Sequence, residues 1–300
     1  MTSEAADNLS QMAHTLEKSG DYRVLRRLVP RDVFTPVPVD QQIKVGVIFD
    51  VETTGLDPKA DEVIELGMVK FAYRPDGRVA RVIDSFGSLN EPANTIPAEI
   101  TILTGITNEM VAGKRIDAAA VSSFVADANI VIAHNAIFDR KFAERYWPEF
   151  EHKSWACSVT EIDWRAHGFE GSRLGYLLMG AGLFHTAHRA VDDCRALLEI
   201  LAMPLAKTKQ PALASLLDHA RRNTVRIWAE SSPYELKDEL RKQGYRWNDG
   251  SDGRPRSWHI EIDEGLLDAE MSYLRNEIYC RSVDLLVQRL TALTRFSDRS

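Results

Sequence analysis

Residues 43–50 read Ile-Lys-Val-Gly-Val-Ile-Phe-Asp, and Val51 and Glu52 follow directly. A short, mostly apolar run of this kind predicts a buried β-strand. Asp50 and Glu52 are separated by one residue, so on a strand both carboxylates point to the same face. Two like charges this close repel each other, and burying them is costly without a counterion. A divalent cation such as Mg²⁺ or Mn²⁺ resolves this conflict. The competing interpretation is a solvated strand end with two surface acids.

The segments that follow predict a mixed α/β fold. Residues 63–73 and 79–86 are predicted strands, and residues 75–77 (Pro-Asp-Gly) between them give a strong turn signal. The first three strands should therefore form an antiparallel meander. From 97 to 205, helical and strand patterns alternate, with a short buried strand at 129–134. A meander followed by this alternation predicts a mixed sheet with helices packed on it.

Two later segments carry polar groups that suit the same chemistry. Residues 134–139 read His-Asn-Ala-Ile-Phe-Asp after a buried strand, which places Asp139 in the first turns of a helix. Taken alone, Asp139 is a helix-start acid favoured by the helix dipole. Residues 188–193 read His-Arg-Ala-Val-Asp-Asp, which places Asp193 about one turn into another helix and His188 just before it. Taken alone, this pair is a capping histidine and a surface acid.

In this order and spacing, the three motifs resemble the DEDD superfamily of 3′→5′ exonucleases. They are Asp-x-Glu-Thr-Thr-Gly-Leu from Asp50, His-Asn-Ala-x-Phe-Asp ending at Asp139, and His-x-Ala-x-x-Asp ending at Asp193. The related branch of the superfamily has a tyrosine where this chain has Arg189. The chain is therefore similar to the histidine branch, typified by the proofreading epsilon subunit of bacterial DNA polymerase III. The resemblance covers about residues 43–205 and implies a ribonuclease-H-like fold.

The resemblance also implies a role for each polar residue of the motifs. Two divalent cations, Mg²⁺ or Mn²⁺, would be held by four acids, with Asp50 bridging them. Glu52 and Asp193 would complete the first cation site, and Asp139 would hold the second. His188 would be the general base, because an unperturbed imidazole with a pKa of about 6.5 is largely neutral at pH 7. Two such cations can neutralise the transition state and activate water.

Substrate contacts are expected from residues around the first two motifs. Gly55 should permit close approach of the backbone to the 3′-terminal nucleotide. Leu56 could wedge against the terminal base or stack on it, and simple core packing is its alternative. His134 and Asn135 are more simply structural than ligating, while Phe138 should pack beneath the site or touch the substrate. The predicted substrate-binding set is Thr53, Thr54, Gly55, Leu56, His134, Asn135 and Phe138.

Changes in composition and residue pattern divide the chain into four parts. Residues 1–40 are predicted to be a helical extension, residues 41–206 the exonuclease domain and residues 207–214 a linker. Residues 215–300 are predicted to be a small α+β accessory domain, in which tryptophans and tyrosines are interleaved with arginines. These aromatic residues either form the core of the small domain, which is the favoured interpretation, or grip a single strand of nucleic acid.

Composition limits the classes of function. A length of 300 residues suggests about two domains. The net charge of −7 argues against a surface that grips nucleic acid throughout, but not against an enzyme that reaches phosphates through cations. Three widely spaced cysteines suggest neither a disulfide framework nor a zinc site. No apolar stretch is long enough for a membrane span, and the N-terminus lacks a secretory signal, so a cytoplasmic location is expected.

The sequence therefore predicts a metal-dependent 3′→5′ exonuclease acting on a single-stranded or frayed 3′ end of DNA. An exoribonuclease is the alternative within the same class, since RNA is not excluded. A polymerase-associated or clamp-associated nucleic-acid-binding protein is the alternative from another class, and the complete acidic set with His188 argues against an inert site. The sequence leaves open the pathway, the partner and the oligomeric state.

Overall fold

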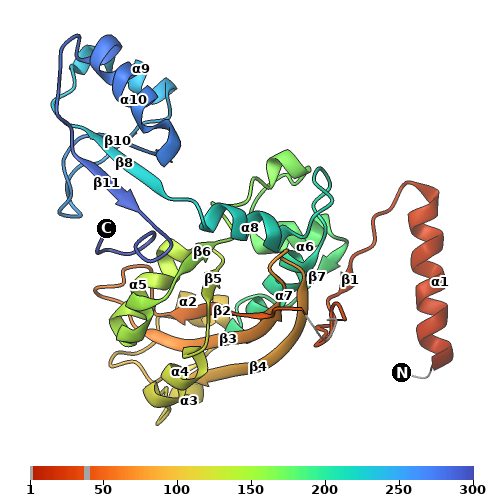
Figure 1. Ribbon diagram of the computed structural model, residues 1–300. Helices are drawn as coiled ribbons and strands as arrows, with labels where there is room; N and C mark the ends of the chain where they lie inside the picture. Colours follow the sequence, from red (N-terminus) through yellow and green to blue (C-terminus); the bar gives the residue numbers. More distant parts are fainter. Residues whose placement is uncertain (1–2, 37–40) are drawn as a thin grey trace.

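The computed structural model describes residues 3–36 and 41–300. Its centre is a five-stranded sheet in the order β4-β3-β2-β5-β6 (Figure 1). The meander strands β2, β3 and β4 pair in antiparallel fashion. Strand β5 runs parallel to β2, and β6 runs parallel to β5. This arrangement confirms the predicted mixed sheet. The strands are β2 (Lys44–Thr53), β3 (Val63–Tyr73), β4 (Val79–Leu89), β5 (Ile130–Ala133) and β6 (Trp155–Cys157).

Helices cover both faces of this sheet, and the alternation of β2 decides which residues face which layer. Val47 and Phe49 point into an apolar cluster with Phe142 of α5. Ile48 points the other way, into a cluster with Leu197 of α7. Asp50 and Glu52, near the end of β2, lie two and four residues after Ile48. Their side chains therefore point to the same face as Ile48, toward α7. The helices are α2 (Ala98–Thr104), α3 (Asn108–Val111), α4 (Ala118–Val125), α5 (Ala136–Tyr146), α6 (Leu174–Gly180), α7 (Ala190–Ala202) and α8 (Ala212–Ala220).

Helix α8 packs with the part of the chain that holds the central sheet, where the sequence suggested a linker at 207–214 and a new domain from 215. Leu213 and Leu216 of α8 lie in the same apolar cluster as Leu197 of α7. The apolar spacing of α8 is visible in the sequence, but the sequence does not say which core the helix joins. We therefore propose that the accessory domain begins after α8.

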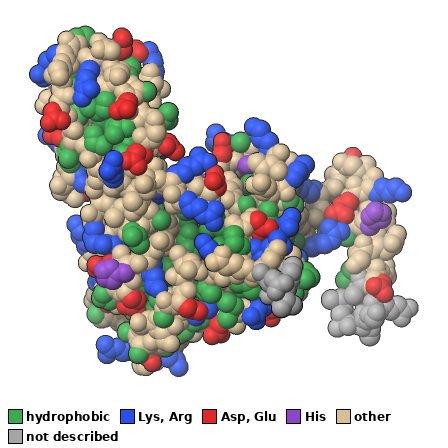
Figure 2. Space-filling model, in the orientation of Figure 1, with side chains coloured by type: hydrophobic (Ala, Val, Ile, Leu, Met, Phe, Trp, Pro, Cys, Tyr) green, Lys and Arg blue, Asp and Glu red, His purple; other side chains and the backbone are tan. Residues whose placement is uncertain are grey.

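The C-terminal part contains a four-stranded antiparallel sheet in the order β11-β8-β10-β9. Val225 and Ile227 of β8 pack against Leu240 of α9 and Leu274 beyond α10, which makes a separate apolar core. Acidic and basic side chains are intermixed on the face of this part that Figure 2 shows. Its elements are β8 (Thr224–Ala229), α9 (Lys237–Lys242), β9 (Arg246–Trp247), β10 (Trp258–Asp263), α10 (Leu267–Tyr273) and β11 (Val287–Leu290).

The aromatic residues of this part divide between core and surface. Trp228 and Tyr245 are buried, each with only 2% of its surface exposed. Tyr234 and Trp247 are 74% and 51% exposed. The favoured interpretation, that the aromatic residues form the core, therefore holds for Tyr245, which lies in the apolar cluster of this part. Trp228 is buried against His259 outside that cluster, and the interpretation is wrong for the exposed Tyr234 and Trp247.

The N-terminal segment is helical only at its start. The backbone N–H groups of Arg26 and Leu28 donate to the carbonyls of Gly182 and Phe184, so this stretch pairs in parallel with a distant strand. The prediction of a helical extension over residues 1–40 is therefore wrong for the residues that follow the first helix, and residues 37–40 lie outside the described ranges. The elements are α1 (Ser3–Ser19), β1 (Arg26–Arg27) and β7 (Leu183–Phe184).

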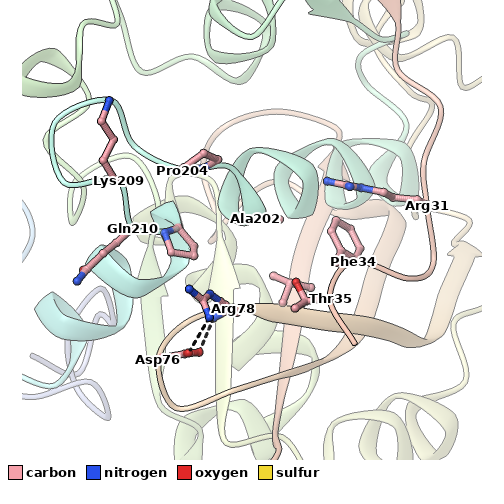
Figure 3. A pocket seen from close by; sticks show the side chains of 11 residues that line it. Arg31, Phe34, Thr35, Asp76, Arg78, Ala202, Pro204, Lys209 and Gln210 are labelled. Atoms are coloured by element: carbon pink, nitrogen blue, oxygen red, sulfur yellow. Dashed lines mark hydrogen bonds and ion pairs between the residues drawn. The ribbon is translucent and has the colours of Figure 1, made fainter. Parts of the chain in front are cut away.

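The same segment forms one wall of a pocket of about 380 Å³ (Figure 3). An ion pair between Arg78 and Asp76, 3.7 Å long, lies at its edge. None of its lining residues is a predicted site residue, so this pocket is separate from the acidic motifs. The pocket is lined by Arg31, Phe34, Thr35, Asp76, Arg78, Val79, Ala202, Pro204, Lys209, Gln210 and Pro211.

Within the described residues, no helix is long and apolar enough to cross a membrane.

Candidate active site

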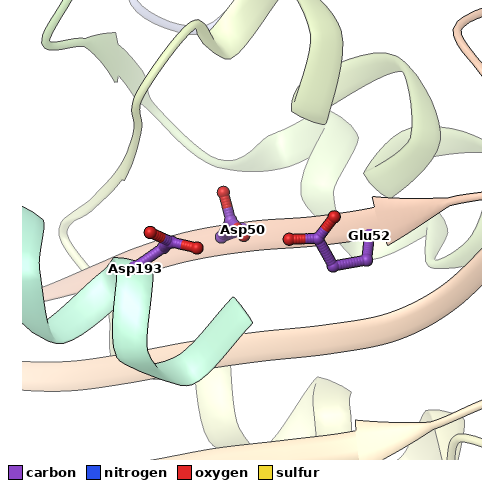
Figure 4. Close-up of side chains that lie close together, drawn as sticks. All are labelled: Asp50, Glu52 and Asp193. Carbon is purple, nitrogen blue, oxygen red and sulfur yellow. The ribbon is translucent and has the colours of Figure 1, made fainter. Parts of the chain in front are cut away.

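Three of the predicted acids converge between β2 and α7. One carboxylate oxygen each from Asp50, Glu52 and Asp193 lies within 4.8 Å of the others (Figure 4). Asp50 and Glu52 share a face of β2 because they are two residues apart, and Asp193 lies in the first turn of α7. Packing of α7 on the sheet therefore joins two motifs that are about 140 residues apart in the chain.

Asp139 lies beside this group and enters from a different helix. Its side chain is 2% exposed, and it accepts a hydrogen bond of 3.3 Å from the backbone N–H of Val51. The negative charge of Asp139 is one of the influences that raise the pKa of Asp50. Burial also raises the pKa of Asp139 itself well above the ordinary range. The four acids of the motifs thus form one mutually repelling set, in which Asp139 is buried and the other three are half-buried.

The raised pKa values of these acids indicate that the site suits a cation. Burial, followed by the charges of Asp139 and Asp193, raises the pKa of Asp50 well above its usual range. Burial, followed by the charges of Asp193 and Glu65, raises the pKa of Glu52 to about 8. Carboxylates that repel each other in a buried place fit a hard divalent cation, which prefers oxygen ligands and removes the repulsion. The donor set therefore suits the predicted kind of cation.

Asp193 also organises the turn that leads into α7. Its Oδ2 accepts hydrogen bonds from the backbone N–H groups of His188, at 2.7 Å, and Arg189, at 3.2 Å. His188 has a left-handed backbone with φ of 66°, a conformation that costs about 1–3 kcal/mol in a residue other than glycine. The two backbone hydrogen bonds to Asp193 help to hold this strained turn in place.

A second histidine, which the sequence analysis missed, contacts the same acid. His185 Nε2 lies 2.5 Å from Asp193 Oδ1. The ring of His188, the predicted general base, makes no hydrogen bond among the described residues. His185 stands three residues before the third motif, and a second histidine in that loop was the only signal for it. The structure therefore brings two histidines to Asp193 in different ways, His185 through its ring and His188 through its backbone N–H.

Glu65 and Arg189 form a further contact that the sequence analysis did not use. Glu65 is 5% exposed and lies opposite Glu52 in the β2–β3 register, so both side chains share a face. It accepts hydrogen bonds from Arg189 Nη2, at 2.9 Å, and from the backbone N–H of Ala190, at 3.1 Å. These bonds tie the start of α7 to β3. The strand register was the signal that could have found Glu65.

In the loop after Glu52, the structure differs from the prediction in the space beside Gly55. A Cβ atom on Gly55 would lie 2.5 Å from the carboxylate of Asp61, so the space beside this glycine is filled by Asp61. Thr54 Oγ1 donates to the same carboxylate at 3.2 Å, and Thr53 Oγ1 donates to the carbonyl of Gly55 at 2.6 Å. Leu56 is 83% exposed, which makes its alternative, core packing, wrong. The apolar side chain of Leu56 is left facing solvent.

The second motif supplies mostly structural contacts. His134 Nδ1 lies 2.8 Å from Ser158 Oγ, and burial lowers the pKa of this histidine to about 4. The ring of Phe138 packs against Phe142, with 5.0 Å between ring centroids. Asn135 is exposed and has a left-handed backbone with φ of 83°. Of the three, Asn135 is the residue that is open to solvent.

The sequence is similar to bacterial replication proteins. The DNA polymerase III PolC-type protein of Thermotoga petrophila is 30% identical over 186 residues, which are 57% of this chain and 12% of that protein. DNA polymerase III subunit epsilon of Treponema pallidum is 31% identical over 188 residues, which are 59% of this chain and 84% of that protein. The chain thus spans only a small part of the PolC-type relatives and most of the epsilon subunit.

The matching solved structures include exonucleases. A zinc-bound complex of E. coli Exonuclease I with single-stranded DNA matches with a TM-score of 0.49 at 16% identity, over 84% of this chain and 64% of that one. Exonuclease X bound to duplex DNA with a 5′ overhang matches with a TM-score of 0.41 at 22% identity, over 56% of this chain and 99% of that one. The family model described as Exonuclease (RNase T) matches residues 47–201. That span is more than half of the chain and holds all three motifs, so this protein belongs to the exonuclease family.

Proposed function

We propose that this protein removes nucleotides one at a time from the 3′ end of DNA by metal-dependent phosphodiester hydrolysis. The observation that carries the proposal is the convergence of Asp50, Glu52 and Asp193 within 4.8 Å, in a chain of the exonuclease family. The raised pKa values of Asp50 and Glu52 support it, because these half-buried carboxylates repel one another unless a cation joins them.

We assign the four acids to two divalent cations, Mg²⁺ or Mn²⁺. Asp50, Glu52 and Asp193 would hold the first, and Asp139 with Asp50 would hold the second. Two bound cations would neutralise charge on the phosphorane-like transition state and lower the pKa of the attacking water. The buried position of Asp139 keeps its carboxylate in place on α5.

His188 is the proposed general base, which takes a proton from the attacking water. Its place directly before α7, with its backbone N–H bound to Asp193, supports this role. His185 would act through Asp193 by holding the Oδ1 atom of that carboxylate.

The exposed side chain of Leu56 is proposed to stack on the terminal base of a single-stranded or frayed end. Similarity to an epsilon subunit supports a polymerase or its clamp as a partner.

A panel of end-labelled substrates tests the proposal. Single- and double-stranded DNA and RNA with a 5′ label would be incubated with Mg²⁺, Mn²⁺ or excess chelator. We expect a ladder of products shortened from the 3′ end of DNA, and no products in chelator. Asp193→Asn should abolish the ladder, while Asp192→Asn should keep it, because Asp192 is the neighbouring exposed acid and serves as a matched control.

Each other result has a defined meaning. Undiminished cleavage in chelator would sink the metal-dependent mechanism, and an active Asp193→Asn variant would refute the assignment of that acid. Faster shortening of RNA than of DNA would identify an exoribonuclease. Binding of DNA without any cleavage would identify an accessory protein.

A further inference from the structure

We propose that residues 291–300, here called the C-terminal latch, position helix α5 and its acid Asp139 for catalysis. The latch follows β11 of the accessory sheet and returns to the catalytic part of the molecule. Figure 1 shows the C-terminus beside α5, between that helix and the accessory sheet. The proposal rests on the proposed function, because it assigns Asp139 to the second cation.

The first support is the next residue along α5. Arg140 is fully buried, with 0% of its surface exposed. Its Nη1 donates to the carbonyl of Arg295 at 2.6 Å, and its Nη2 donates to the carbonyl of Leu293 at 2.6 Å. Its Nε donates to Glu144 on the same helix at 2.6 Å. The latch therefore supplies the partners for a buried guanidinium next to Asp139, and a buried charge without partners is strongly unfavourable.

The second support is the edge of the central sheet. The backbone N–H of Trp155, on the edge strand β6, donates to the carbonyl of Ala292 at 2.8 Å. Arg295 forms a buried ion pair with Glu161. Glu161 also accepts a hydrogen bond of 2.7 Å from the backbone N–H of Cys157, at the end of β6. The latch thus covers an otherwise open strand edge and fixes its end.

The third support is the outer face of α5. Glu144 accepts hydrogen bonds from Ser297 Oγ, at 2.6 Å, and from Arg299 Nη2, at 2.8 Å. Lys141 forms an ion pair of 2.8 Å with Asp298, but this pair lies at the surface and such pairs contribute little. Phe296 packs against the apolar cluster that α5 shares with the sheet. The latch therefore contacts successive turns of the helix that carries Asp139.

The latch is held from its other side by the accessory domain. Arg226 and Arg254 both donate to the backbone of Ser300. Arg295 donates to the carbonyl of Arg222, between α8 and β8. These contacts make a continuous path from the accessory sheet through the latch to α5. The accessory domain is thus attached to the second cation site, and its removal would strip partners from Arg140 and Glu161.

The test compares two substitutions on α5 in the 300-residue chain. Arg140→Met removes the latch contacts, and Lys141→Met is the matched control, because Lys141 pairs with the latch only through a surface ion pair. Three quantities would be measured: Mn²⁺ binding by calorimetry, hydrogen exchange of the α5 amides without metal, and kcat and KM on single-stranded DNA. Arg140→Lys and Phe296→Ala provide milder variants that keep the fold if Arg140→Met does not fold.

We expect Arg140→Met to weaken one of two Mn²⁺ sites and to lower kcat, each by about 10–100-fold, with little change in KM. Exchange of the α5 amides should become faster, Arg140→Lys should recover part of the loss, and Lys141→Met should behave as the wild type. Folded Arg140→Met or Phe296→Ala protein with normal Mn²⁺ binding and normal α5 exchange would overturn the proposal. Binding and exchange are read without substrate, so a protein that cuts no nucleic acid would refute the proposed function and leave this test intact.

Discussion

Asp193 connects several parts of the candidate site through one carboxylate. One of its oxygens lies against the imidazole of His185, and the other accepts two backbone N–H groups at the start of α7. The same carboxylate lies within 4.8 Å of Asp50 and Glu52. The two nearby histidines therefore have different relations to it: the backbone of His188 and the ring of His185 contact Asp193.

Substitution of each histidine separates the two roles. His188→Ala should lower kcat by about 10²- to 10⁴-fold at every cation concentration, because a general base is lost. His185→Ala should instead raise the Mn²⁺ concentration needed for half-maximal activity, and excess Mn²⁺ should restore much of the rate. Steady-state kinetics over a Mn²⁺ titration measures both effects. A large loss in His185→Ala that no cation concentration restores, with His188→Ala near wild type, would move the base assignment to His185.

At the scale of elements, the position of α7 depends on the absence of a side chain on β3. A Cβ atom on Gly67 would lie 2.3 Å from the carbonyl carbon of Ala190, the first residue of α7. Backbone packs directly on backbone at this point, one turn before Asp193. The contact sets the distance between α7 and the acids at the end of β2.

Gly67→Ala should therefore move α7 and damage the site. We expect a loss of about 1–3 kcal/mol in the free energy of unfolding, because overpacking forces the elements apart. The rate of hydrolysis should fall as Asp193 withdraws from Asp50 and Glu52. Gly175→Ala in α6 is the control, since a Cβ atom there meets nothing within 4 Å. Thermal unfolding and kcat measure the two effects, and equal behaviour of both variants would contradict this account of α7.

The elements also differ in how well local patterns predicted them. The strand predicted at 63–73 has the observed bounds of β3, because its apolar run and the turn after it are local signals. The stretch around Arg26 was predicted as helix and is a strand, because its backbone partners lie near Leu183. Asp139 was placed on its helix correctly from the preceding buried strand. The pairing of Arg26 with Leu183, across more than 150 residues, leaves no local pattern in the sequence.

At the scale of the whole molecule, the buried acids should make stability depend on pH and on cations. Glu52 has an ordinary pKa of 4.5 in an unfolded chain and about 8 in the folded protein. The native state therefore binds more protons over this interval, and the free energy of unfolding falls as pH rises from about 4.5 to about 8. Asp50 and Asp139 act in the same direction.

The metal-free protein should thus lose thermal stability between pH 6.5 and 8, by about 2–4 °C for each kcal/mol of lost stability. This window lies above the ordinary pKa of 6.5 for His134, whose lowered pKa acts mainly at more acidic pH. Saturating Mg²⁺ should remove most of the loss, because a cation favours the charged carboxylates. Glu52→Gln should flatten the metal-free profile. Calorimetric unfolding in chelator measures it, and a Tm that rises over this window would contradict the prediction.

The sequence by itself determined the central sheet and the acids that converge on it. Alternation along residues 43–52 put two carboxylates on one face, and motif order supplied Asp139, His188 and Asp193. Such features are local, because period and spacing fix where a side chain points.

Only the tertiary structure decided how the site is supported. The contact of His185 with Asp193, the pairing of Glu65 with Arg189 and the return of the C-terminal latch to Arg140 join distant parts of the chain. The physical reason is that these contacts depend on how elements pack. In the latch the accepting groups are backbone carbonyls, which every residue carries, so no residue type marks them in the sequence.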